Sequence, residues 1–113
     1  MQRPLSISFR DIDPSPAVEA RVRSHVEKLE HLYNQIIGCH VVIEAPHHSQ
    51  HKGKLYRANI NIKVPNGEIV VNSTGPKDHA HEDIYVAIRD AFDAAARRLE
   101  DHVRRVRDAK NAP

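Results

Sequence analysis

The sequence has few of the residues on which many functional sites depend. Its 113 residues include one cysteine, no tryptophan, two phenylalanines and four glycines. A single cysteine, Cys39, cannot form an internal disulfide, and this favours a reducing compartment. Because Cys39 flanks an apolar strand, we expect a small buried side chain and not a nucleophile. With so few aromatic residues and glycines, the chain offers neither a stacking platform for bases nor a glycine-rich phosphate loop.

Long hydrophobic runs are also missing. No run approaches the roughly 18 apolar residues that span a bilayer. The N-terminal segment MQRPLSISF lacks the longer apolar core of a signal peptide. We therefore expect a soluble, cytoplasmic protein. The hydrophobic fraction of 40% supports one domain over residues 1–113, with an ordered core at about 4–107 and a tail at 108–113.

The clearest pattern occupies the last third of the chain, from His81 to Lys110. Apolar residues recur there at steps of three and four, which predicts one buried face of an α-helix. They are Ile84, Ile88, Ala91, Phe92, Ala95, Leu99, Val103 and Val106. At about 1.5 Å per residue the helix would measure roughly 35–40 Å. We expect the other elements to pack along it.

Arginines occupy the other faces of this predicted helix. At 100° per residue, Arg97 and Arg104 lie near one azimuth, and Arg98 and Arg105 lie near another. Acidic residues sit among them, so a solvated face of alternating charge is the ordinary interpretation. The alternative is a positive surface for nucleic-acid phosphates. Because the net charge is only +2, such binding would depend on where the charges lie.

The N-terminal part predicts a strand and then a helix. Apolar and polar residues alternate from Leu5 to Arg10, as in a strand with one apolar face. Ser15 can cap a helix whose first residue is Pro16, because proline lacks the N–H that a first turn leaves unpaired. We expect this helix to end near Asn34. Its apolar stripe comprises Val18, Val22, Val26, Leu29, Leu32 and Tyr33.

Three further strands are predicted at residues 39–45, 56–64 and 69–72. The sequence Pro65-Asn66-Gly67 predicts a hairpin turn, because Asn-Gly accepts the positive φ of tight turns. The order β-α-β-β-β-α implies one parallel pair followed by antiparallel hairpins. Because polar residues fill the outer positions of the strands, both helices must cover the inner face. We therefore predict an α+β fold, a two-layer sandwich of a four-stranded sheet with two helices on one face.

This order places a basic flank of the first helix in the helix layer. Arg21, His25 and Lys28 would line one wall, with arginines of the long helix beside them. Arginine and lysine on helix faces suit recognition of phosphates and backbone shape better than recognition of bases. This arrangement favours nucleic-acid binding more than the long helix does alone.

The chain resembles the ribosome hibernation-promoting factor family, which includes the ribosome-associated translation inhibitors and was formerly described as sigma-54 modulation proteins. The resemblance covers roughly residues 5–107. It rests on the element order and on three runs, Val26-Glu27-Lys28-Leu29-Glu30, Asp83-Ile84-Tyr85-Val86-Ala87-Ile88 and Arg97-Arg98-Leu99. The family typically has Asp-x-Tyr-x-Ala-Ile at the second run and an Arg-Gln-Leu-like sequence at the third, where Arg98 replaces the usual glutamine.

The resemblance implies the β-α-β-β-β-α sandwich and a non-enzymatic function. Family members bind the small ribosomal subunit between head and body, occupy the mRNA and tRNA channel, and silence translation in stressed or stationary cells. The implied partners are the small subunit and its rRNA, with no cofactor, DNA, membrane or small-molecule substrate. Lys28 and Arg97 are the first candidates for rRNA contact. Weaker candidates are Arg21, Arg98, Arg104 and Arg105.

Two departures from the family pattern affect these expectations. Glu100, Asp101 and His102 follow the third run, where the family usually has lysines, so we expect weaker RNA binding or a shifted pose. Long members add a linker and a second domain that pairs ribosomes. This chain stops at Pro113, so ribosome dimerisation by this chain alone is not implied.

Nine histidines keep a different function open. Five of them would meet at one end of the sheet, close to acidic residues, and such tracts bind Zn²⁺ or Ni²⁺. They are His47, His48, His51, His79 and His81. Solvated loop histidines are the simpler interpretation, because no element fixes a compact ligand spacing. A general structured-RNA-binding domain is another alternative. An enzyme is disfavoured because the sequence has no nucleophile motif.

Overall fold

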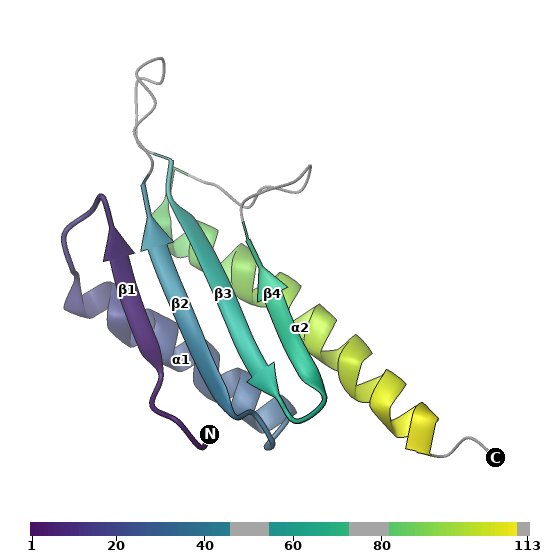
Figure 1. Cartoon of the computed structure of the whole chain (residues 1–113). Coiled ribbons are helices and arrows are strands. Elements are labelled where there is room, and N and C mark those ends of the chain that lie inside the picture. The colour runs from purple at the N-terminus through teal and green to yellow at the C-terminus, as the bar shows by residue number, and fades with distance from the viewer. Residues whose placement is uncertain (46–54, 73–81, 111–113) are drawn as a thin grey trace.

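A computed structural model describes residues 1–45, 55–72 and 82–110 (Figure 1). Within them the elements are β1 (Ser6–Arg10), α1 (Pro16–Leu32), β2 (Gly38–Glu44), β3 (Arg57–Val64), β4 (Gly67–Val71) and α2 (Ile84–Lys110). The strands form one sheet in the order β1-β2-β3-β4. β1 pairs parallel with β2, whereas the β2–β3 and β3–β4 pairs are antiparallel. The predicted fold class and element order are confirmed.

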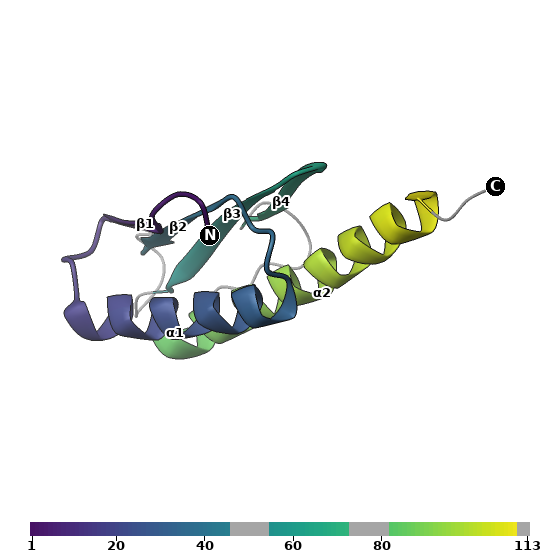
Figure 2. The same cartoon turned by 90° about the horizontal axis from the view of Figure 1, so that it is seen from below.

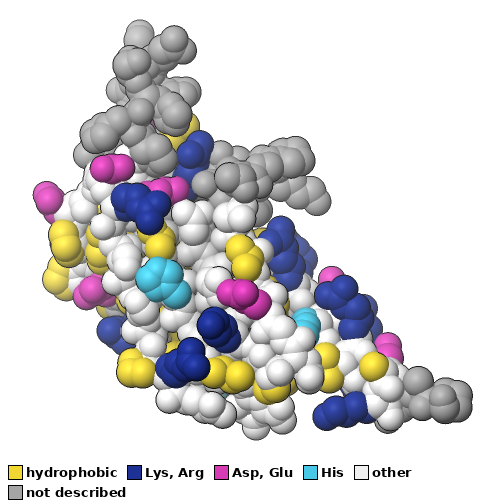
Figure 3. Space-filling model, viewed as in Figure 1, with side chains coloured by type: hydrophobic (Ala, Val, Ile, Leu, Met, Phe, Trp, Pro, Cys, Tyr) yellow, Lys and Arg dark blue, Asp and Glu magenta, His cyan; other side chains and the backbone are white. Residues whose placement is uncertain are grey.

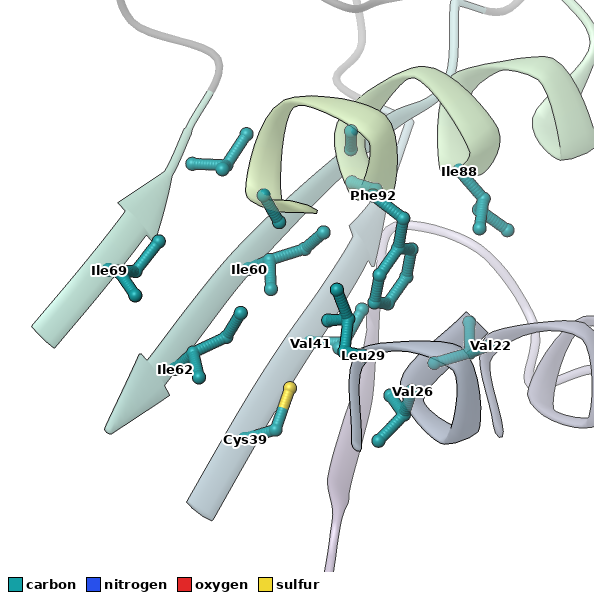
Figure 4. Close-up of a cluster of buried hydrophobic side chains, with 14 of the residues drawn as sticks. Val22, Val26, Leu29, Cys39, Val41, Ile60, Ile62, Ile69, Ile88 and Phe92 are labelled. Carbon is teal, nitrogen blue, oxygen red and sulfur yellow. The ribbon is translucent and has the colours of Figure 1, made fainter. Parts of the chain in front are cut away.

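Both helices lie on one side of the sheet, as Figure 2 shows. Strand alternation explains this arrangement, because Val41 and Ile43 of β2 and Ile60 and Ile62 of β3 all point inward and are at most 1% exposed. Figure 4 shows Val41, Ile60 and Ile62 of the sheet facing apolar residues of α1 and α2, and the Phe92 ring lies between the two helices. The alternate positions on the outer face are mostly polar, apart from Val42 and Val70, and nearly all are exposed or half-buried. The sheet is therefore covered on one face only.

Side-chain caps set the start of each helix. The backbone N–H of Val18 donates to Oγ of Ser15 at 3.3 Å, and Pro16 is the first helical residue, as predicted. α2 begins three residues later than predicted, at Ile84. Its cap is Asp83, whose Oδ1 accepts a hydrogen bond from the backbone N–H of Tyr85 at 2.9 Å.

Two local predictions were wrong. α1 ends at Leu32 and not near Asn34, because Tyr33 adopts extended backbone with φ −151° and its ring packs against the core. Leu32, placed in the apolar stripe by its spacing, is 45% exposed.

The hairpin turn lies where it was expected, with Val64 paired to Gly67. However, Asn66 has no positive φ, since Asp11 is the one non-glycine residue with positive φ in the described ranges.

Close contacts fix α2 against the β4 side of the sheet. A Cβ atom at Gly67 would lie 3.2 Å from Cε1 of His102, so the glycine allows the helix to approach the hairpin. A guanidinium nitrogen of Arg98 donates a hydrogen bond to the backbone oxygen of Val70 on β4. Beyond this region the last turns of α2 extend past the sheet (Figure 1), and Val103 and Val106 are only half-buried. Neither described helix is apolar enough over a sufficient length to cross a membrane.

Candidate nucleic-acid interface

Basic residues from both helices converge on a cleft between α1 and α2. The cleft has a volume of about 440 Å³, and we call it the interhelical cleft. It is lined by Arg21, Ser24, His25, Lys28, Tyr85, Val86 and Arg89. Three of these side chains are cationic and none is acidic. Positive charge from two separate elements is thus concentrated at one concave place, although the net charge of the chain is small.

Aromatic contacts position the cleft residues. The guanidinium carbon of Arg21 lies 4.7 Å from the centroid of the Tyr85 ring, which is a cation–π contact between the two helices. The His25 ring stacks on Phe92, with centroids 5.0 Å apart and planes 9° from parallel. Because Phe92 is buried in the core, this stack holds His25 of the cleft lining against the packed interior.

The electrostatic environment of His25 reports the positive field of the cleft. Its pKa is lowered, chiefly because burial removes solvent from the charged form, and next because Lys28 and Arg21 repel a further cation. Asp93 opposes the shift but does not cancel it. An anionic ligand in the cleft would relieve this repulsion, so the site favours anions on electrostatic grounds.

A second part of the basic surface lies farther along α2. Arg97 and Arg104 are seven residues apart and therefore share an azimuth, about opposite the buried Ala95. Both side chains are exposed. Arg104 forms an ion pair with Asp101, with 3.8 Å between Nη1 and Oδ1. We use the term basic helix surface for Arg21, Lys28, Arg89, Arg97 and Arg104.

Arg98 and Arg105 lie on a different flank of α2. Arg98 contacts the backbone of β4, and Arg105 lines a hollow with Asn66 and His102 beside the β3–β4 hairpin. The six predicted contact residues therefore form two groups. Arg21, Lys28, Arg97 and Arg104 belong to the basic helix surface, whereas Arg98 and Arg105 face the β4 side.

Two functional candidates were missing from the predicted contact set. Arg89 lines the interhelical cleft and forms an ion pair of 3.3 Å with Asp90. Tyr85 holds Arg21 in place from the opposite helix. The signal in the sequence is the four-residue spacing of Tyr85 and Arg89, which places both on one helix face but does not show that this face meets α1.

The alternative of a histidine metal site and the expected burial of Cys39 can be compared with the structure only in the described ranges. Those ranges contain no group of three or more metal-binding side chains. His47, His48, His51, His79 and His81 all lie outside them. Cys39 is buried, and this burial, with a smaller effect of Glu30, raises the pKa of its thiol to about 12. The thiol is therefore neutral at physiological pH and unsuited to nucleophilic catalysis.

Comparisons with known proteins agree with the fold. The family model described as sigma 54 modulation protein / S30EA ribosomal protein matches residues 5–107. A ribosomal subunit interface protein from Coxiella burnetii is 15% identical with a TM-score of 0.67, and the alignment covers 87% of this chain and 94% of that one. The N-terminal domain of Thermus thermophilus Protein Y is 20% identical with a TM-score of 0.69, covering 86% and 94%. No curated protein sequence matches the chain.

Proposed function

The chain belongs to the sigma 54 modulation protein / S30EA ribosomal protein family, and on that premise we propose that it binds the ribosome through the basic helix surface. The observation that carries this proposal is the convergence of Arg21, Lys28 and Arg89 on one cleft. The names of the family and of the Coxiella relative refer to the ribosome, and this supports the choice of partner. A cytoplasmic location follows from this proposal.

We further propose that the contacted partner is the rRNA of the small subunit. Ribosomal RNA presents phosphate groups at high density, and arginine binds phosphate through a planar fork of donors. Arg97 and Arg104 are exposed on the same azimuth and extend the cationic surface from the cleft along α2. Asp93, Glu100 and Asp101 lie among these arginines, so we expect moderate affinity that depends strongly on salt.

Arg98 and Arg105 have a smaller role in this proposal. Arg98 is engaged by the backbone of β4, and Arg105 faces the hairpin. A flat RNA surface that covers the basic helix surface would meet these two side chains only at its margin. We expect them to contribute less to binding than Arg97 and Arg104.

The proposed action is occupancy of the mRNA and tRNA channel, without a chemical step, in stressed or stationary cells. A folded domain of this size excludes mRNA and tRNA by its volume. The non-enzymatic character is supported by the interhelical cleft, whose lining offers cations but no carboxylate, and by the neutral, buried thiol of Cys39. Inhibition should therefore require about one protein per ribosome.

A purified translation assay tests this proposal. The protein would be titrated against a fixed ribosome concentration, and inhibition should saturate near equimolar protein and be reversed by excess initiation components. Complete inhibition far below equimolar protein would indicate an enzyme acting catalytically. Absence of inhibition above that ratio would contradict translational silencing, and sedimentation with small subunits would then show whether binding alone remains.

A further inference from the structure

The open face of the sheet, opposite the helices, contains a hollow where β2 begins. Strand register places Ser6, His40 and Asn61 in one row across β1, β2 and β3. In the next row Gly38 pairs with Lys63. Gly38 has no side chain, and the side chain of Arg3 packs over its backbone, so Gly38 itself is buried. Figure 3 shows this face, with basic side chains and histidine close together in its lower part.

The segment before β1 closes the hollow on its remaining side. The backbone N–H of Arg3 donates to the backbone oxygen of Ile37 at 2.9 Å, which holds the segment against the start of β2. Side-chain atoms of Arg3 would lie 3.6 Å from a Cβ atom placed on Gly38. The resulting cavity has a volume of about 310 Å³. We call it the sheet hollow, and its polar lining comes from Arg3, Ser6, His40, Asn61 and Lys63.

Much of the exposed lining is apolar and includes Pro4, and its polar groups are cations and neutral hydrogen-bond donors with no carboxylate. Arg3 and Lys63 stand at two sides of the hollow, and within the described ranges neither forms an ion pair. A hydrogen bond of 2.9 Å joins Nδ1 of His40 to Oγ of Ser6. In the tautomer in which Ser6 donates, Nε2–H of His40 is free to donate to a ligand. The nearest acid by strand register is Glu68, the β4 partner of Lys63.

We propose that the sheet hollow binds a phosphate group, at a site separate from the basic helix surface. Two cations and neutral hydrogen-bond donors around a hollow without a carboxylate are the chemistry that recognises phosphate. The volume is at the small end of ligand pockets, which are typically about 300–1,000 Å³. A phosphate with one attached nucleoside fits this size. The phosphate comes either from a free nucleotide or from the backbone of an RNA strand.

Titration calorimetry with adenosine monophosphate tests the free-nucleotide source. We expect saturable binding by the full chain, with adenosine binding far more weakly because it lacks the phosphate. Lys63→Gln and Arg3→Gln should each weaken binding about tenfold or more, since each removes a charged donor. Glu68→Gln should tighten binding by removing the nearest acid. Arg10→Gln, at the opposite end of the outer face and paired with Glu44 at 3.7 Å, is the matched control and should have no effect.

Gly38→Ala is a neutral control beside the hollow, because it changes no charge. Its Cβ would meet Arg3 at ordinary contact distance, and Gly38 is not among the positive-φ residues of the described ranges, so the variant should fold. Because Arg3 need not move, we expect Gly38→Ala to leave nucleotide binding and thermal melting nearly unchanged, in contrast to Arg3→Gln. Arg97→Glu with Arg104→Glu should leave nucleotide binding intact, which separates this site from the basic helix surface.

Co-sedimentation with ribosomes tests the RNA source. If adenosine monophosphate does not bind, Lys63→Gln and Arg3→Gln should still weaken ribosome binding relative to Arg10→Gln, and this would assign the phosphate to RNA. The proposal is overturned if neither nucleotide nor ribosome binding responds to these two variants while circular dichroism shows them folded. It is also overturned if adenosine binds as tightly as its monophosphate.

Discussion

The Phe92 ring lies between the core and the proposed binding surface, 3% exposed and stacked on His25. Phe92→Ala would leave a cavity among α1, α2 and the sheet, and we expect it to lower the free energy of unfolding by about 3–5 kcal/mol. A small domain has little more than this to lose. Chemical denaturation followed by circular dichroism measures the change. A loss below about 1 kcal/mol would contradict a role for this ring in filling the core.

His25 links stability to pH, because its pKa is lower in the folded chain than its ordinary value of about 6.5. Between the two values the unfolded chain binds more protons, so stability should fall as pH drops through this window and should be fully present above it. His25→Phe keeps a ring stacked on Phe92 but cannot titrate. We expect the variant to lose less stability than the parent between pH 7 and 5. Equal losses in thermal melts would show that His25 does not contribute.

The two flanks of α2 differ, because Arg97 is exposed to solvent whereas Arg98 contacts the backbone of β4. Substitution of each arginine tests whether they have different roles. Arg98→Met removes a hydrogen bond to the β4 backbone, so the free energy of unfolding should fall by roughly 0.5–1.5 kcal/mol. Arg97→Met, its matched neighbour on the outer azimuth, should leave stability unchanged but weaken ribosome binding. If Arg98→Met weakened binding as much as Arg97→Met, RNA would contact the β4 flank as well.

Element order, strand pairing and the buried faces could be predicted from the sequence. A strand or helix that is buried on one side repeats its apolar residues every 2 or about 3.6 positions, and this repeat is visible in the sequence. The positions that differed depend on tertiary contacts. Leu32 has helical spacing but remains largely exposed beside α2, and Tyr33 leaves the helix to pack on the core. Likewise Arg97 and Arg98 are adjacent and equally basic, and only the position of β4 separates their roles. The interhelical cleft depends on the contact between Arg21 of α1 and Tyr85 of α2, and the sequence pattern of either helix alone does not show that these residues meet.

The whole molecule has two chemically different faces, because the sheet is covered on one side only (Figure 2). The helix side carries the basic helix surface, and the sheet side carries mostly polar residues and the sheet hollow. With a net charge of +2, long-range attraction to RNA is weak, and binding depends on several local phosphate contacts acting together. Such binding should be sensitive to salt and to the position of each charge.

Affinity for purified small ribosomal subunits, measured by co-sedimentation across a salt series, tests the central claim most directly. Arg97→Glu with Arg104→Glu changes the basic helix surface, whereas Arg10→Glu with Arg23→Glu makes the same change in charge elsewhere. We expect the first pair to weaken binding strongly and to reduce the slope of log affinity against log salt by about 2. We expect the second pair to have little effect. Equal affinities and slopes for the two folded variants would contradict binding through the basic helix surface.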